Sequence, residues 1–132
     1  MATLLDTDVA IHLQDGDSWI EDRARQLEPP LFISTITRIE LENGVWREPE
    51  WVKIRQATLD QLLSVVRVLE FGASEVEAYR QIVANTGYSC RKTADRITAA
   101  TALVHKMRLV TLNGRDFRDV SGLKLIEWSR GS

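Results

Sequence analysis

Short apolar runs alternate along this chain with longer segments in which apolar residues recur every three or four positions. A short run bounded by turn residues is typical of a buried strand, whereas the three-to-four spacing is typical of an amphipathic helix. We expect strands at residues 3–5, 31–33, 67–71, 109–111 and 123–127, and helices at 9–13, 19–27, 35–47, 51–66, 75–85 and 94–106. Strands separated by helices predict the α/β class: a three-layer α/β/α sandwich with a central parallel sheet and right-handed crossovers.

Polar residues mark the expected ends of these helices. Small polar side chains favour the position before the first helical residue, and glycine favours the position after the last one. On this basis we predict N-caps at Asp8, at Ser34 or Thr35, at Ser74 and at Thr93, and a helix end at Gly87.

Length and composition restrict the class of protein. The 132 residues suit one domain, 1–132, and the 44% hydrophobic fraction is ordinary for a globular protein. No apolar run approaches the ~20 residues of a membrane span, and no signal-peptide layout is present, so we expect a cytoplasmic protein. The lone cysteine, Cys90, suits a reducing compartment, and we expect it to be buried. A net charge of −2 excludes a strongly basic nucleic-acid binder, so basic side chains or a metal would have to act locally.

Two acids lie where strand ends are expected to meet. Asp6 follows the first strand directly, and Asp116 follows the fourth strand through an Asn-Gly turn. Ligands of open α/β sheets bind beyond the carboxyl ends of the strands, so both positions suit a metal or phosphate site. Ordinary turn or capping chemistry explains each acid equally well.

Two further acids lie on helices. Glu40 falls at the margin of a predicted apolar stripe on helix 35–47, formed by Ile36, Ile39 and Trp46. Asp95 lies in the first turn of helix 94–106, where a carboxylate also favours the positive helix end. Small residues on the same side of that helix would let it pack closely on the sheet.

Together, Asp6, Glu40, Asp95 and Asp116 are all expected at one rim of the sheet. Carboxylates that gather there need a compensating cation, and oxygen ligands favour a hard ion, Mg²⁺ or Mn²⁺. Such an ion suits phosphodiester hydrolysis by activated water. His12 and His105 have no partner at zinc-site spacing, and we interpret both as ordinary helix residues.

Four segments, at residues 4–9, 34–41, 93–103 and 110–117, resemble the PIN-domain family, and within it the VapC- and FitB-like toxins. They occur in the family's order and span nearly the whole chain. The resemblance implies an α/β/α sandwich, Mg²⁺- or Mn²⁺-dependent endoribonuclease activity, a homodimer and a small cognate antitoxin protein. One departure is Ile97-Thr98, where two apolar residues are expected.

Carried over by position, the four acids match the family's acidic quartet, as catalytic and metal-binding residues. Thr7 and Asn113 are candidates to assist through their polar side chains, and Asp8 is either a cap or a further catalytic acid. From charge alone, Arg91, Lys92 and Arg96 beside Asp95 are candidates to hold RNA phosphates, or are simply a solvated helix start.

Two alternatives remain. Asp6-Thr7-Asp8-Val9 also fits the opening motif of haloacid-dehalogenase-like phosphatases, with Asp6 as nucleophile and Asp8 as general acid. That reading leaves Glu40 and Asp95 without a role. The second alternative is a PIN-like binding module that does not catalyse a reaction. The identity of the RNA is not readable from the sequence.

Overall fold

A five-stranded parallel sheet forms the centre of the computed structural model, which describes residues 1–130. Its order is β3-β2-β1-β4-β5, and every pairing between neighbours is parallel. The strands are β1 (Thr3–Leu5), β2 (Leu31–Ser34), β3 (Val66–Leu69), β4 (Arg108–Thr111) and β5 (Lys124–Glu127). The predicted parallel sheet is confirmed. The last two residues of the expected domain, 131–132, lie outside the described residues.

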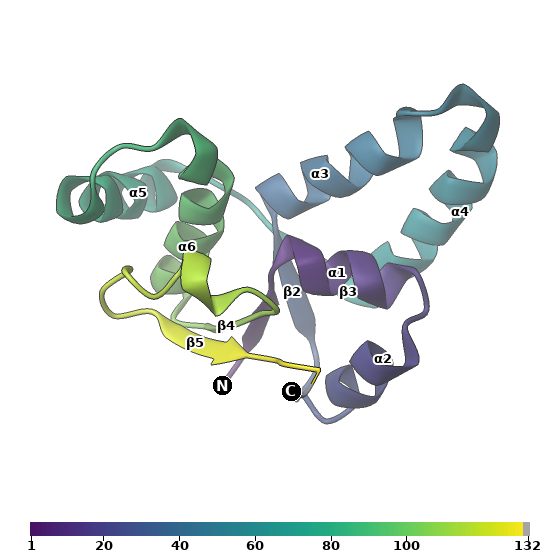
Figure 1. The fold of residues 1–132 in the computed structure, drawn as a ribbon, viewed down its shortest axis with the longest axis horizontal. Coiled ribbons are helices and arrows are strands. Elements are labelled where there is room, and N and C mark those ends of the chain that lie inside the picture. The colour runs from purple at the N-terminus through teal and green to yellow at the C-terminus, as the bar shows by residue number, and fades with distance from the viewer. Residues whose placement is uncertain (131–132) are drawn as a thin grey trace.

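Helices cover both faces of this sheet, as Figure 1 shows. One side carries α1 (Thr7–Gln14), α2 (Ser18–Ala24), α3 (Thr35–Trp46) and α4 (Val52–Leu63), and the other carries α5 (Ala73–Thr86) and α6 (Thr93–His105). Residues 1–130 also contain three short 3-10 turns: η1 (Pro49–Trp51), η2 (Cys90–Lys92) and η3 (Gly114–Asp116). The predicted three-layer α/β/α sandwich is therefore confirmed. Among residues 1–130, no helix has both the length and the apolar character to cross a membrane.

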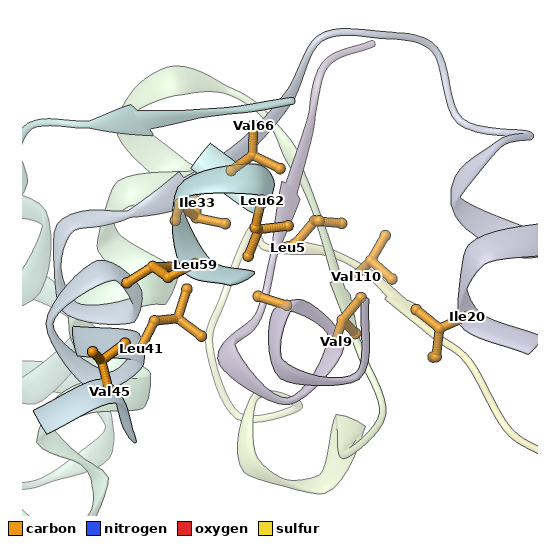
Figure 2. Packing of buried hydrophobic residues seen from close by; sticks show 11 residues of the cluster. Leu5, Val9, Ile20, Ile33, Leu41, Val45, Leu59, Leu62, Val66 and Val110 are labelled. Carbon is orange, nitrogen blue, oxygen red and sulfur yellow. The ribbon is translucent and has the colours of Figure 1, made fainter. Parts of the chain in front are cut away.

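Two hydrophobic clusters fix the helices to the sheet. Successive side chains of a strand point to opposite faces, so Leu5 and Val110 pack with α1 to α4, whereas Leu4 and Leu109 pack with α5 and α6. Figure 2 shows the first cluster between the sheet and its helices. This packing holds β1 and β4 side by side and brings their carboxyl ends to the same edge.

Three of the predicted helix caps are wrong. Asp6 rather than Asp8 caps α1, because the helix already begins at Thr7. Gly72 rather than Ser74 precedes α5, and its N–H donates to the side chain of Glu75 at 3.1 Å. Lys92 rather than Thr93 precedes α6. The caps at Ser34 and the helix end at Gly87 are confirmed.

The buried face of α3 also differs from the prediction. Its buried residues are Thr37, Leu41 and Val45, whereas Ile39 and Trp46 remain 48% and 56% exposed. The helix packs against α1 and α4, and it uses a threonine in the contact where the apolar pattern indicated isoleucine. The predicted stripe was therefore wrong.

Cys90 lies in η2 and is exposed, so the expectation of a buried thiol was wrong. The loop that contains it runs over the surface between α5 and α6, where no core is available to cover a small apolar side chain.

Candidate active site

Asp6 is held at the junction of β1 and α1. Its backbone N–H donates to Val110 O at 2.9 Å, which extends the β1–β4 pairing by one residue. One carboxylate oxygen accepts from the Thr7 N–H at 2.9 Å, and the other accepts from the Thr111 hydroxyl at 2.7 Å. The residue is only 7% exposed. Asp6 is thus a buried helix cap whose orientation is fixed by β4 and by the first residue of α1.

Asp8 lies beside Asp6, one residue inside the helix. Its carboxylate accepts from the backbone N–H of Val9 at 2.7 Å and, at 3.3 Å, from that of Leu112, which follows β4. Burial raises the pKa of Asp8, and these two N–H groups oppose that rise. Burial also raises the pKa of Asp6 to about 7, with the charge of Asp8 as the second cause. The negative charge of Asp8 therefore makes Asp6 harder to ionise.

Glu40 reaches the same edge from α3. Its Oε1 accepts from the Thr7 hydroxyl at 2.6 Å, so the first residue of α1 fixes the direction of a side chain from a different helix. The Thr7 hydroxyl also lies 2.9 Å from the Thr37 hydroxyl. Thr7, a candidate to assist through its side chain, is thus placed against Glu40.

Asp95 and Asp116 complete the group of acids. Burial raises the pKa of Asp95 to about 6, followed by the charges of Asp116 and Glu40, while the cationic Arg96 lowers it. Asp116, in η3, accepts from the side-chain amide of Asn113 at 2.7 Å. The charges of Asp116, Glu40 and Asp8 all act on Asp95, and the charge of Asp95 acts on Asp6, so these acids lie within electrostatic reach of Asp95.

The carboxylate oxygens of these acids suit a hard cation, although the acids are too far apart to enclose one. Oxygen-only ligands favour Mg²⁺ or Mn²⁺. Burial raises the pKa values of Asp6, Asp8 and Asp95, and neighbouring acids add to the rise at Asp6 and Asp95, so a bound cation would relieve the cost of ionising these carboxylates. Within residues 1–130, no three His, Cys, Asp or Glu side chains lie close enough together to enclose an ion directly. Mg²⁺ commonly binds through one or two carboxylates and keeps several waters, so this looser arrangement fits the ion's ordinary chemistry.

The three basic candidates differ in availability. Arg91 is exposed and Lys92 is half-buried in η2, next to the helix turn that carries Asp95. Arg96 is only 4% exposed, and both its terminal nitrogens donate to the carboxylate of Asp119 at 2.8 Å. Arg96 is therefore committed to a structural ion pair and is not placed to hold RNA phosphates.

Sequence reasoning missed several hydroxyl residues of the site. Thr111 bonds directly to Asp6, and its place as the last residue of β4 was an available signal, because that strand ends at the same edge. Thr37 contacts Thr7 directly, and Ser34 and Thr98 follow it in a series of buried hydroxyls. Ser34 was predicted only as a helix cap, and no local pattern distinguishes Thr37 and Thr98 from ordinary helix residues. Their role depends on contacts between distant segments.

A family model and several sequence relatives match most of the chain. A family model described as "PIN domain" matches residues 3–123. "Ribonuclease VapC1" of Rickettsia felis is 33% identical over 132 residues, covering 96% of each chain. "tRNA(fMet)-specific endonuclease VapC" of Shigella flexneri is 26% identical over 129 residues, covering 96% of this chain and 97% of that one.

Solved structures share the fold. VapBC2 of Rickettsia felis, bound to a promoter DNA fragment, aligns with a TM-score of 0.84 at 23% identity, covering 97% of this chain and 99% of that chain. FitAcB of Neisseria gonorrhoeae aligns with a TM-score of 0.79 at 24% identity, covering 95% and 96%. The sheet order and helix layers described above are thus those of a known group of structures.

Proposed function

The chain belongs to the PIN-domain family, and on that premise we propose that it is a metal-dependent endoribonuclease, the toxin of a toxin–antitoxin pair, acting as one domain over 1–132. The observation that carries the proposal is the mutual effect of the acids. Asp95 has a pKa raised to about 6 by burial and by the charges of acids that come from three other elements. Strongly perturbed carboxylates that come from separate elements are enriched at functional sites, where a cation or a reacting group uses them. The relatives' names, ribonuclease and endonuclease, support the reaction class.

Asp6, Glu40, Asp95 and Asp116 are the residues that would hold Mg²⁺ or Mn²⁺. When bound, such an ion supplies activated water and stabilises charge on the reacting phosphate. The chain's own contribution is orientation. Thr111 and the Thr7 N–H fix Asp6, the Thr7 hydroxyl fixes Glu40, and Asn113 fixes Asp116.

The RNA would approach over η2. Arg91 and Lys92 are the basic side chains available beside Asp95, and positive charge there would offset the repulsion between phosphate and the acids. Single-stranded or loop RNA suits a rim of this kind better than a duplex does, because unpaired nucleotides can bend toward recessed carboxylates.

A small antitoxin is the proposed protein partner, in keeping with the VapBC and FitAB complexes among the structural relatives. A cavity of about 350 Å³ adjoins Glu40 between α1, α3 and α4. Exposed apolar side chains lie on α3, η1 and α4 nearby: Ile39, Trp46, Trp51 and Ile54. Such a surface suits burial against another protein chain, either the antitoxin or the second subunit of the homodimer that we also propose. An active ribonuclease of this kind would act in the cytoplasm, where its RNA substrates and the antitoxin are present.

The family match removes the support for the haloacid-dehalogenase alternative. Asp6 is also poorly suited to be its nucleophile, because it is buried and both carboxylate oxygens accept hydrogen bonds. The non-catalytic binding module remains the competing function.

The test is RNA cleavage by the purified chain, with total RNA as substrate. We expect cleavage with Mg²⁺ or Mn²⁺, none in EDTA, and recovery when Mn²⁺ is added back. Mapping the cleaved ends identifies the substrate. Undiminished cleavage in EDTA contradicts the metal requirement. Absence of cleavage with every divalent ion, by a chain that is folded and binds RNA, favours the binding module.

A further inference from the structure

Four hydroxyl groups connect α6 with Glu40 through the interior. Thr98 Oγ1 lies 3.2 Å from Ser34 Oγ, and Ser34 Oγ lies 3.1 Å from Thr37 Oγ1. Thr37 Oγ1 lies 2.9 Å from Thr7 Oγ1, which lies 2.6 Å from Glu40 Oε1. Three of these residues are almost fully buried: Ser34 and Thr37 are 0% exposed and Thr98 is 1% exposed.

Each hydroxyl has one proton to donate, and this fixes which group donates and which accepts in each hydrogen bond of the series. An ionised carboxylate only accepts, so the single hydroxyl proton of Thr7 goes to Glu40. Thr7 must then accept from Thr37, whose one proton is used in that bond. Thr37 accepts from Ser34, which in turn leaves Thr98 as the donor to Ser34. All four hydroxyl protons therefore point toward Glu40.

We propose that these hydroxyls are positioning residues for the Glu40 carboxylate, with Thr98 as the first donor of the chain. Hydrogen bonds aligned in one direction polarise one another, so each donor strengthens the next. The Glu40 side chain has rotatable bonds that would otherwise be free, and a directed donor from α1 restricts them. This series of hydroxyls also makes the position of Glu40 depend on α6, the helix that carries Asp95.

Thr98 is the informative member. Its helix face packs against the sheet with Ala99 and Ala102, both 0% exposed, and an aliphatic side chain would fill that space as well. A buried hydroxyl costs free energy unless it is hydrogen-bonded, so its presence calls for a polar role. Ser34 has a second structural role that would explain its hydroxyl, because its Oγ accepts from the Thr37 N–H at 3.2 Å as the cap of α3.

The experiment compares Thr98→Val with Thr98→Ser and with a matched control, Thr101→Val. Thr101 is buried on the same helix, but its hydroxyl donates to Ile97 O at 2.9 Å and takes no part in the chain. For each variant we measure kcat and KM for RNA cleavage with Mn²⁺, the Mn²⁺ dissociation constant by calorimetry, and unfolding in urea.

We expect Thr98→Val to lower kcat by about three- to tenfold, the size expected from the loss of one hydrogen bond, while KM stays at the parent value. Thr98→Ser should restore kcat, and Thr101→Val should match the parent in kcat although it too changes stability. A Thr98→Val protein with the parent's kcat and Mn²⁺ affinity overturns the proposal. So does a loss of kcat that Thr101→Val shows equally, since that marks a general packing effect.

The inference rests on the proposed function. Two outcomes distinguish a failure of the ribonuclease proposal from a failure of the hydroxyl proposal. A parent chain that binds Mn²⁺ without cleaving RNA overturns the ribonuclease proposal, and the hydroxyl chain is then judged by Mn²⁺ affinity, which should fall in Thr98→Val and not in Thr101→Val. A parent that neither cleaves RNA nor binds Mn²⁺ overturns both. If Thr98→Val does not fold, Thr7→Val carries the test. It removes the last donor and should lower kcat by roughly 10- to 100-fold, and unchanged kcat and Mn²⁺ affinity in that variant refute the proposal.

Discussion

Arg96 and Asp119 form a two-pronged ion pair, in which Nη1 and Nη2 each donate to a different carboxylate oxygen at 2.8 Å. The arginine is 4% exposed and its partner 45% exposed, so a buried cation is neutralised by an acid at the surface. Arg96 directly follows Asp95, and Asp119 lies three residues after Asp116. The pair thus ties together the two segments that carry these acids.

Asp119→Ala should destabilise the fold by about 2 kcal/mol, because it leaves the buried Arg96 without a partner. The double variant Arg96→Met/Asp119→Leu removes both charges and should recover much of that loss. The measurement is urea unfolding of the two variants beside Glu42→Ala, which breaks the half-exposed Arg38–Glu42 pair on α3 and should cost well under 1 kcal/mol. A double variant as unstable as Asp119→Ala contradicts this account.

The metal-free protein should lose stability as the pH rises from about 4 to about 7. Burial raises the pKa of Asp6 to about 7, so across this range the folded state binds a proton that the unfolded state has released. Stability therefore falls with rising pH and levels off above the folded-state pKa. Asp6→Asn removes the ionised carboxylate, although it also weakens the hydrogen bonds that the carboxylate accepts, and it should unfold at pH 8 at the same or a higher denaturant concentration than the parent. The check is urea unfolding at pH 5 and pH 8 in EDTA, and an Asp6→Asn protein with the parent's pH dependence excludes Asp6 as the source.

Asp95→Asn should abolish RNA cleavage and most of the stabilisation by metal. Mn²⁺ at a hundred times its dissociation constant should stabilise the parent by about 2.7 kcal/mol, and the variant by much less. Thermal unfolding with and without Mn²⁺, paired with RNA cleavage, measures both effects, and Asp8→Asn in the same assays decides whether Asp8 is more than a structural acid. A fully active Asp95→Asn protein with normal metal stabilisation rules out the quartet.

Arg91→Ala and Lys92→Ala should weaken RNA binding through charge. Each should raise KM and reduce the dependence of log affinity on log salt by about 0.7, the value for one contact to single-stranded nucleic acid. The control is Arg25→Ala, which removes an exposed arginine at the end of α2, a helix that carries none of the four acids. If log affinity depends on log salt equally in the parent and all three variants, the RNA does not contact Arg91 or Lys92.

Part of this protein is determined by local sequence. The alternation of short apolar runs with amphipathic segments predicted the five strands, the six helices and the parallel sheet, because hydrophobic period is a local property of the chain. Parallel strands also direct their carboxyl ends to one edge, so the convergence of Asp6 and Asp95 at that edge was expected from connectivity alone.

Tertiary structure decided which side chains meet. α3 buries Thr37 and leaves Ile39 exposed, because the neighbouring helices and the hydroxyl of Thr7 select its inner face, and hydrophobicity alone does not. Arg96, a plausible phosphate contact by sequence, is removed from the surface by an acid 23 positions away. Thr98 reads as a local irregularity until Ser34, 64 positions earlier, is placed beside it. Hydrogen bonds and ion pairs depend on distances of about 3 Å between atoms of distant segments, and only the packed fold sets those distances.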